Sequence, residues 1–151
     1  QLHVALVGAG PQRDRLAAML PPARCTLLGA LPPDRVATAL QACDVMVLPT
    51  VREGWPNVVT EALATDRPVV ASAVGGIPDI LAGPEGAACG ALTAVGDVAA
   101  IAAGIRRFLA TPPEPGVVRS FAERYSWEEP IALLSELFAG ILEATPLRGT
   151  V

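Results

Sequence analysis

Two carboxylates, Glu53 and Glu61, stand on either side of a loop that joins an apolar run to a helical pattern. Residues 45–48 predict a buried strand, and residues 58–64 predict the first turns of a helix. The unpaired N–H groups at the start of that helix favour an anion above the sheet. The two carboxylates are suited to accept hydrogen bonds from hydroxyl groups beside the anion. An anion flanked by hydroxyls describes a nucleotide sugar.

The rest of the chain alternates short apolar runs with helical patterns, joined by turns rich in glycine and proline. This alternation predicts an α/β fold with a doubly wound parallel sheet, in which ligands bind at the carboxyl ends of the strands. We expect strands at residues 2–7, 25–29, 45–48, 68–71 and 88–93, and helices at 13–20, 33–42, 58–64, 79–81, 98–109, 117–124 and 128–143. Leu16, Met19 and Leu20 are expected to face inward. The apolar stripe of the last helix is expected to pack against the sheet or a neighbouring domain.

Length and composition limit the classes of protein to which this chain can belong. The 151 residues predict a single domain over 1–151, with 112–116 as a linker before two C-terminal helices. A net charge of −4 gives no electrostatic case for nucleic-acid binding. No run approaches the roughly 18 apolar residues of a membrane span, and no signal peptide is recognisable. Three cysteines without metal-ligand spacing are expected to be reduced, which favours a cytoplasmic location.

The glycines after the first predicted strand, Gly8 and Gly10, invite a dinucleotide-binding interpretation. The nicotinamide fingerprint needs a third glycine or alanine where this chain has Arg13, and no acidic residue closes the second strand. We therefore expect only a tight turn near the ligand edge. The single histidine, His3, opens a strand and is expected to be structural or solvated.

Two motifs in a fixed order carry a resemblance to a known family. Glu53 and Glu61 are separated by seven residues that begin with GWPN, and the segment RPVVASAVGGIPD follows at residues 67–79. Together they resemble the large retaining glycosyltransferase family called group 1 or family 4, whose members have the two-domain GT-B fold. The resemblance runs from about residue 4 to residue 127.

The resemblance implies roles for the residues of both motifs. Glu61 would hold the ribose hydroxyls, and Glu53 would act catalytically beside the donor sugar and its leaving phosphate. Their alternative roles are a first-turn acid that complements the helix dipole and a solvated loop acid. The remaining expected donor-binding residues are Gly54, Trp55, Asn57, Val58, Val59, Gly8, Gly10, Leu31, Gly75 and Gly76, with the amides of 57–59 as candidates for the diphosphate. For Trp55 and the glycine pair the alternatives are loop packing and a plain turn. No metal or cofactor is expected, because fixed dipoles can take the role of a cation.

The chain departs from the family pattern in three respects. Asp66 stands where the family usually has glycine, and Asp79 replaces the more usual glutamate. Family members open this domain with one more strand and helix, which carry an Arg and a Lys for the diphosphate, whereas this chain has no lysine. We therefore expect a Rossmann-like fragment that lacks this first strand and helix and the N-terminal acceptor domain, and that is inactive alone. Another copy, as a homo-oligomer, or a neighbouring chain is expected to cover the open sheet edge.

The resulting prediction is the donor-binding domain of a retaining glycosyltransferase that moves a sugar from a nucleotide-diphosphate sugar to an unknown acceptor. In the longer enzyme it would be cytoplasmic or peripheral to a membrane. A non-catalytic nucleotide-binding or interaction module of the same fold is the alternative, favoured by the absent Arg and Lys. A nucleotide-sugar epimerase of similar fold is disfavoured by the paired glutamates.

Overall fold

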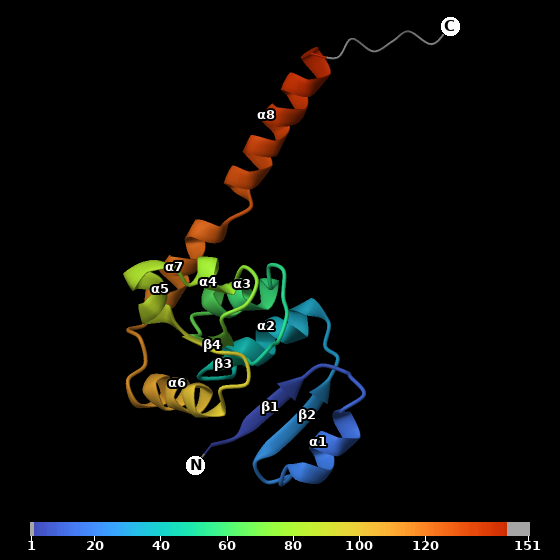
Figure 1. Cartoon of the computed structure of the whole chain (residues 1–151), viewed down its shortest axis with the longest axis vertical. Coiled ribbons are helices and arrows are strands. Elements are labelled where there is room, and N and C mark those ends of the chain that lie inside the picture. Colours follow the sequence, from blue (N-terminus) through green and yellow to red (C-terminus); the bar gives the residue numbers. More distant parts are fainter. Residues whose placement is uncertain (1, 145–151) are drawn as a thin grey trace, which may run out of the picture.

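The computed structural model of the protein describes residues 2–144 and shows strands alternating with helices (Figure 1). Residues 1 and 145–151 of the predicted domain lie outside the described residues. The strands are β1 (Val4–Val7), β2 (Cys25–Gly29), β3 (Met46–Leu48), β4 (Val69–Ser72) and β5 (Gly90–Thr93). The helices are α1 (Arg13–Met19), α2 (Pro33–Gln41), α3 (Asn57–Ala64), α4 (Ile77–Ile80), α5 (Gly83–Cys89), α6 (Val98–Ala110), α7 (Val117–Ala122) and α8 (Glu128–Ala144), with a 3-10 turn η1 (Glu123–Tyr125) after α7. The predicted order of elements is confirmed, with α5 as an additional helix.

The strands of this α/β fold form two parallel sheets. β1 pairs with β2, and β3, β4 and β5 pair in that order. Among the described residues, four strands are paired on one edge only: β1, β2, β3 and β5. The fold class is α/β with parallel strands, but the sheet is divided between β1 and β3.

The core lies around β4, whose four residues are all buried. A strand covered on both faces in a parallel sheet needs apolar residues throughout, which the run of Val69, Val70 and Ala71 supplies. Helix α3 packs its buried residues Val59, Ala62 and Leu63 on one side, and α6 covers the other face (Figure 1). At Gly104 a Cβ would lie 3.0 Å from Val70, so the glycine lets α6 approach closely. This packed half positions the loops that leave β3 and β4.

The unit made of β1, α1 and β2 is poorly covered. Helix α1 has no buried residue, and Met19 is 67% exposed, so the prediction that Met19 faces inward is wrong. Leu20 is partly buried, and Leu16, 38% exposed, lines a hollow against the two strands. An amphipathic helix buries its apolar side only where a second layer meets it. Among the described residues no such layer reaches this side of α1.

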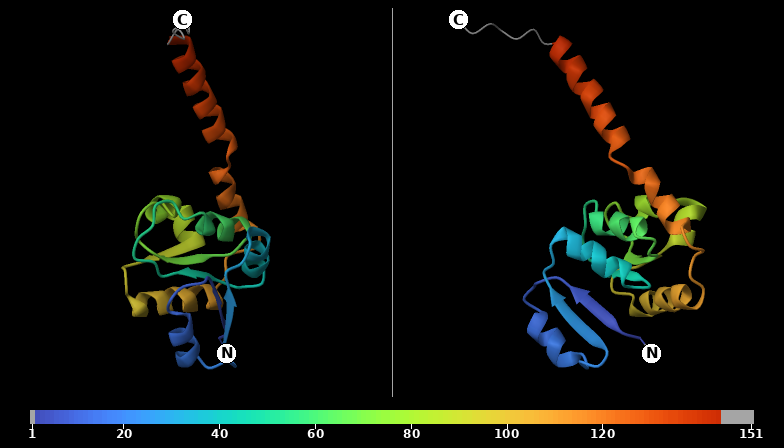
Figure 2. Two further views of the ribbon diagram at one scale, coloured as in Figure 1. Left: turned by 90° about the vertical axis from the view of Figure 1, so that its right-hand side faces the viewer. Right: turned by 180° about the vertical axis from the view of Figure 1, so that it is seen from behind.

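Helix α8 extends away from the rest of the molecule (Figures 1 and 2). Its apolar residues Ile131, Leu134 and Phe138 are about half exposed, so this stripe does not pack against the chain's own sheet within residues 2–144. Packing against a neighbouring domain stays a prediction. None of the helices in the described part of the chain is long and apolar enough to cross a membrane.

The turn after α3 is stabilised by Asp66, which adopts a left-handed conformation with a φ of 64°. Its carboxylate accepts hydrogen bonds from the amides of Gly116, at 2.8 Å, and Arg119, at 3.1 Å. The side chain thus caps α7 from a distant part of the sequence. Burial alone would raise the pKa of Asp66, but these hydrogen bonds outweigh it and the pKa is lowered from its ordinary 3.8.

We predict that Asp66→Ala lowers the free energy of unfolding by about 1–2 kcal/mol at pH 7, the usual range for a lost helix cap. Because the pKa of Asp66 is lower in the folded state, its contribution is complete above pH ~4 and disappears as the pH falls further. Asp66→Asn is the matched control, since asparagine tolerates the same backbone conformation but does not titrate. Urea unfolding at pH 7 and pH 3 measures both effects. Equal pH dependence in the wild type and Asp66→Asn would contradict the prediction.

Candidate functional site

The loop after β3 and the glycine pair after β4 touch each other at the carboxyl ends of these strands. The Gly76 amide donates a hydrogen bond to the Gly54 carbonyl at 2.7 Å. Gly75 has a φ of 55°, and a Cβ there would overlap the Glu53 carbonyl oxygen and lie 2.7 Å from that of Gly54. At Gly76 a Cβ would lie 2.5 Å from Cε3 of Trp55. The two sequence motifs therefore form one continuous surface. They can approach this closely because residues 75 and 76 are glycines.

The first turn of α3 opens onto this surface. Pro56, at the N-cap position, is buried, and no side chain in the described part of the chain caps the helix. The Val59 amide already donates to the Pro56 carbonyl at 3.0 Å. The amides of Asn57 and Val58 have no acceptor among residues 2–144, so these two amides remain as anion donors.

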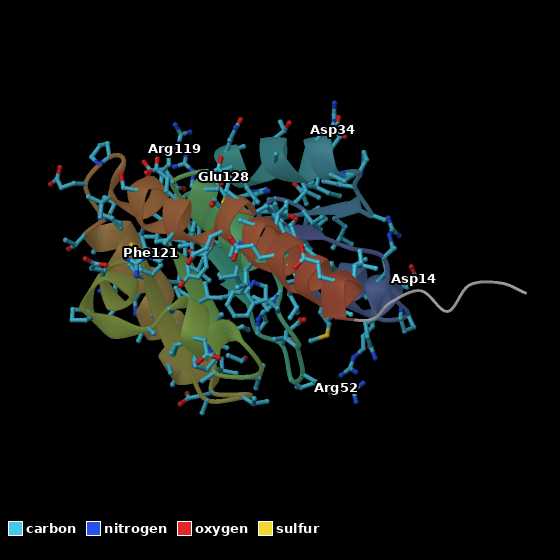
Figure 3. The ribbon with its side chains drawn as sticks, turned by 90° about the horizontal axis from the view of Figure 1, so that it is seen from above. Asp14, Asp34, Arg52, Arg119, Phe121 and Glu128 are labelled. Carbon is cyan, nitrogen blue, oxygen red and sulfur yellow. The ribbon has the colours of Figure 1, made fainter. Side chains whose placement is uncertain are left out.

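The two candidate carboxylates differ in environment. Glu53 is half-buried in the loop, where its backbone carbonyl faces Gly75. Glu61 is exposed and lies four residues after Asn57, so both share one face of α3. Long side chains on a helix lean toward its N-terminus, which directs Glu61 back toward the free amides. The neighbouring cation, Arg52, extends outward from the molecule (Figure 3).

Tyr125, for which the sequence predicts no role, lies in the C-terminal segment and packs against the site. Its hydroxyl donates to the Ile80 carbonyl at 2.7 Å, and burial raises its pKa. Its ring meets Trp55 and Phe121 edge-on, each with centroids 6.1 Å apart. Trp55 is thus held between Gly76 and Tyr125 while half of it stays exposed. Local sequence could not reveal this contact, since it joins residues seventy positions apart.

The remaining candidates lie on the other sheet. Gly8 has a φ of 136°, and its amide donates to the Gly29 carbonyl at 2.7 Å, so the loops after β1 and β2 are neighbours. Gly8 and Gly10 line a hollow of about 340 Å³ together with Leu16. Leu31 is half-buried between β2 and α2. These three candidates therefore belong to the β1–β2 side of the division, apart from the Glu53 loop.

A larger hollow of about 470 Å³ lies at the opposite edge. Asp44, Arg67 and Glu114 line it near the amino ends of β3 and β4. Ligands of parallel sheets bind at the carboxyl ends, so we place the functional site at the Glu53 loop and not here.

Comparison with known proteins identifies the family of the chain. A family model described as glycosyl transferases group 1 matches residues 1–111. The chain belongs to this family.

Two curated relatives and one solved structure illustrate the similarity. Over 131 residues the chain is 30% identical to sulfoquinovosyl transferase SQD2 of Arabidopsis thaliana, which covers 84% of this chain and 26% of that protein. A 2-deoxystreptamine glucosyltransferase of Streptomyces kanamyceticus is 33% identical over 111 residues, or 71% of this chain and 28% of its own length. The structure of sucrose-phosphate synthase from Thermosynechococcus elongatus superposes with a TM-score of 0.80 and 29% identity over 93% of this chain and 39% of that one.

These matches confirm the predicted family and the Rossmann-like fold found in GT-B glycosyltransferases. The chain spans about a quarter of the length of the two curated relatives. They do not test the roles of individual site residues, which stay predictions.

Proposed function

We propose that this chain is the donor-binding domain of a longer, retaining glycosyltransferase that uses a nucleotide-diphosphate sugar. The observation that carries the proposal is the contact of the Glu53 loop with Gly75 and Gly76, beside the free first turn of α3. A carboxylate and two free amides thus lie beside closely packed backbone segments, at the edge of the sheet where β3 and β4 end.

Each part of the site would have a separate task. The Asn57 and Val58 amides would bind the diphosphate, whose negative charge increases as the glycosidic bond breaks. Donors fixed in advance stabilise such charge best, because they need no reorganisation during the reaction. Glu61, on the same helix face as Asn57, would accept hydrogen bonds from the ribose hydroxyls. Glu53 would lie at the sugar end, where positive charge develops on the ring.

The acceptor would be held by a separate domain of the longer protein. Its hydroxyl would attack from the face that the leaving diphosphate departs, so positioning would contribute much of the rate. For the same reason we expect the 151-residue chain to catalyse no transfer alone. The names of the relatives support a glycosyltransferase, and they include glucosyl and sulfoquinovosyl transfer.

The test uses the longer protein that contains this chain and a panel of nucleotide sugars with different bases and hexoses. We expect one donor to be consumed and its anomeric configuration to be retained in the product, which NMR can assign. Calorimetry on the same panel separates binding from turnover. If no nucleotide sugar binds, the proposal is wrong.

The second candidate is a non-catalytic module that binds a nucleotide at the same edge. The observation that favours it is the outward direction of Arg52, the cation that precedes Glu53 in the loop (Figure 3). Donor binding without transfer to any acceptor or to water would select this candidate.

A further inference from the structure

The Glu53 loop, which joins β3 to α3, is held by few backbone hydrogen bonds. Within the described part of the chain, residues 51–55 take part in one backbone–backbone hydrogen bond, from the Gly76 amide to the Gly54 carbonyl. A segment with so few hydrogen bonds opens easily unless its side chains pack against the rest of the protein. The conformation of the loop therefore depends on side-chain contacts.

Trp55 is the loop side chain that supplies these contacts. Val51 is mostly exposed and Arg52 extends outward, so neither of them anchors the loop (Figure 3). The Trp55 ring rests on the backbone of Gly76, where a Cβ would lie 2.5 Å from Cε3 of the ring. Its other contact is with Tyr125, whose ring lies at an interplanar angle of 60° with centroids 6.1 Å apart. Aromatic pairs favour this edge-to-face arrangement.

Tyr125 is itself fixed by contacts that do not involve the loop. Its hydroxyl donates to the carbonyl of Ile80, the last residue of α4, at 2.7 Å. Carbonyls at the end of a helix have no partner within the helix, so the hydroxyl satisfies one of them. Burial raises the pKa of Tyr125, so the hydroxyl stays protonated and donates at neutral pH. Phe121 meets the ring from α7.

Three segments of the chain thus meet at Tyr125. The first is the Glu53 loop, through Trp55, and the second is α4, which begins directly after Gly76. The third is the C-terminal segment, in which α7 lies against α3 and α5 just before α8 leaves the rest of the molecule (Figure 1). Tyr125 therefore contacts both halves of the candidate site from a distant part of the sequence.

We propose that Tyr125 is a positioning residue for the donor site, which acts by holding Trp55 against Gly76 and so fixing the Glu53 loop. The inference rests on the proposed function of this loop. Without the Tyr125 ring the loop occupies further conformations, and only a fraction of the molecules can bind the donor. The apparent dissociation constant for the donor then rises by the inverse of that fraction.

Loss of positioning and loss of stability change different kinetic constants. Loss of positioning raises the donor KM, whereas the complex that does form reacts with an unchanged kcat. Loss of stability reduces the amount of folded enzyme, so the apparent kcat falls while each folded molecule keeps the same KM. Steady-state kinetics on the longer enzyme therefore separate the two roles.

Tyr125→Leu removes the ring, and we expect the donor KM to rise by about tenfold while kcat stays within about twofold. Tyr125→Phe keeps the ring edge and loses only the hydroxyl bond, so its KM is expected within about twofold of the parent value. The matched control is Phe108→Leu, which removes a buried ring of α6 beside the hollow at the opposite edge. We expect this control to be less stable, with an unchanged KM. If Tyr125→Leu does not fold, Tyr125→Met repeats the test, because its flexible side chain can refill the space without offering a ring.

A double-mutant cycle tests whether Tyr125 acts through Trp55. In an enzyme that already carries Trp55→Leu, the ring has nothing to hold, so adding Tyr125→Leu should change the donor KM by less than about twofold. A further tenfold rise in the double variant would show that Tyr125 acts by another route and would overturn the proposal.

The contact can also be measured without a donor in the 151-residue chain. The chain has two tryptophans, and Trp127→Phe at an exposed position leaves Trp55 as the single fluorescent reporter. We expect acrylamide to quench Trp55 more strongly after Tyr125→Leu and equally after Tyr125→Phe. Unchanged quenching in folded Tyr125→Leu would overturn the proposal, and so would an equal rise in KM for Tyr125→Phe and Tyr125→Leu.

The kinetic result also distinguishes this inference from the proposed function. A parent enzyme that binds donor, with an unchanged KM in folded Tyr125→Leu or with a loss of kcat alone, would overturn the positioning role and leave the proposed function intact. A parent enzyme that binds no nucleotide sugar would overturn the proposed function and this inference with it.

Discussion

Gly75→Ala is expected to lower the free energy of unfolding by about 3 kcal/mol or more. This is a large effect for a substitution that removes no side chain. Two costs add at this position. A side chain at a φ of 55° costs about 1–2 kcal/mol by itself. The new Cβ would also overlap the Glu53 carbonyl and approach that of Gly54 to 2.7 Å, and a backbone atom cannot turn away as a side chain can. The Glu53 loop must shift, so donor binding is expected to weaken together with stability.

Gly83→Ala is the matched control for this prediction. Gly83 has a φ of 76°, but a Cβ there meets nothing within 4 Å. It should therefore show the conformational cost alone, about 1–2 kcal/mol, and leave donor binding unchanged. Urea unfolding of both variants measures the difference, which isolates the collision with the loop. Equal losses in the two variants would show that the loop gives way without cost, contrary to the prediction.

The sequence predicts the order of the elements because each strand is a short apolar run closed by glycine or proline. It also predicts that the Glu53 loop and the glycine pair share an edge, since both follow strands of one parallel sheet. The structure adds that the two segments touch directly, through the Gly76–Gly54 hydrogen bond and the close approach of the Gly75 backbone to the loop. Periodicity alone cannot reveal it, because the contact depends on backbone atoms.

The prediction for Met19 is wrong for a physical reason that also applies to the exposed face of α8 and to the open strand edges. Helices α1 and α8 both have the apolar face that the sequence predicts, but an apolar pattern indicates only that a face can be buried. Whether it is buried depends on a second layer, and within residues 2–144 none covers Met19 or Phe138. The same reasoning accounts for the divided sheet, since a strand pattern cannot show whether both of its neighbours are present.

Two further features depend on contacts between distant residues. Asp66 stands where the family usually has glycine, and a side chain at its φ of 64° costs free energy. The structure shows that its carboxylate caps α7, fifty residues later, so it also stabilises the fold. Likewise the Val59 amide, expected to bind phosphate, bonds to Pro56, which restricts the proposed anion site to Asn57 and Val58.

In the longer enzyme, Glu61→Ala and Glu53→Gln are expected to change different kinetic constants. Glu61 is exposed on the second turn of α3, and in the proposed function it contacts the ribose in the ground state and transition state alike. Its loss should weaken donor binding by roughly 1.5–3 kcal/mol, the range for a hydrogen bond to a charged group. Because the loss is nearly uniform, it should appear mainly as a raised donor KM.

Glu53 is half-buried beside Gly75 and would face the sugar, where positive charge develops as the bond breaks. Glu53→Gln keeps the shape and removes the charge, so kcat should fall by more than KM rises. The free nucleoside diphosphate lacks the sugar and should bind Glu53→Gln as well as it binds the parent enzyme.

The control is Glu114→Ala, because Glu114 is an exposed acid at the opposite edge and its loss should change neither kcat nor KM. Calorimetry with the diphosphate and steady-state kinetics measure each effect. The assigned roles are wrong if Glu53→Gln weakens diphosphate binding as much as Glu61→Ala does and leaves kcat intact.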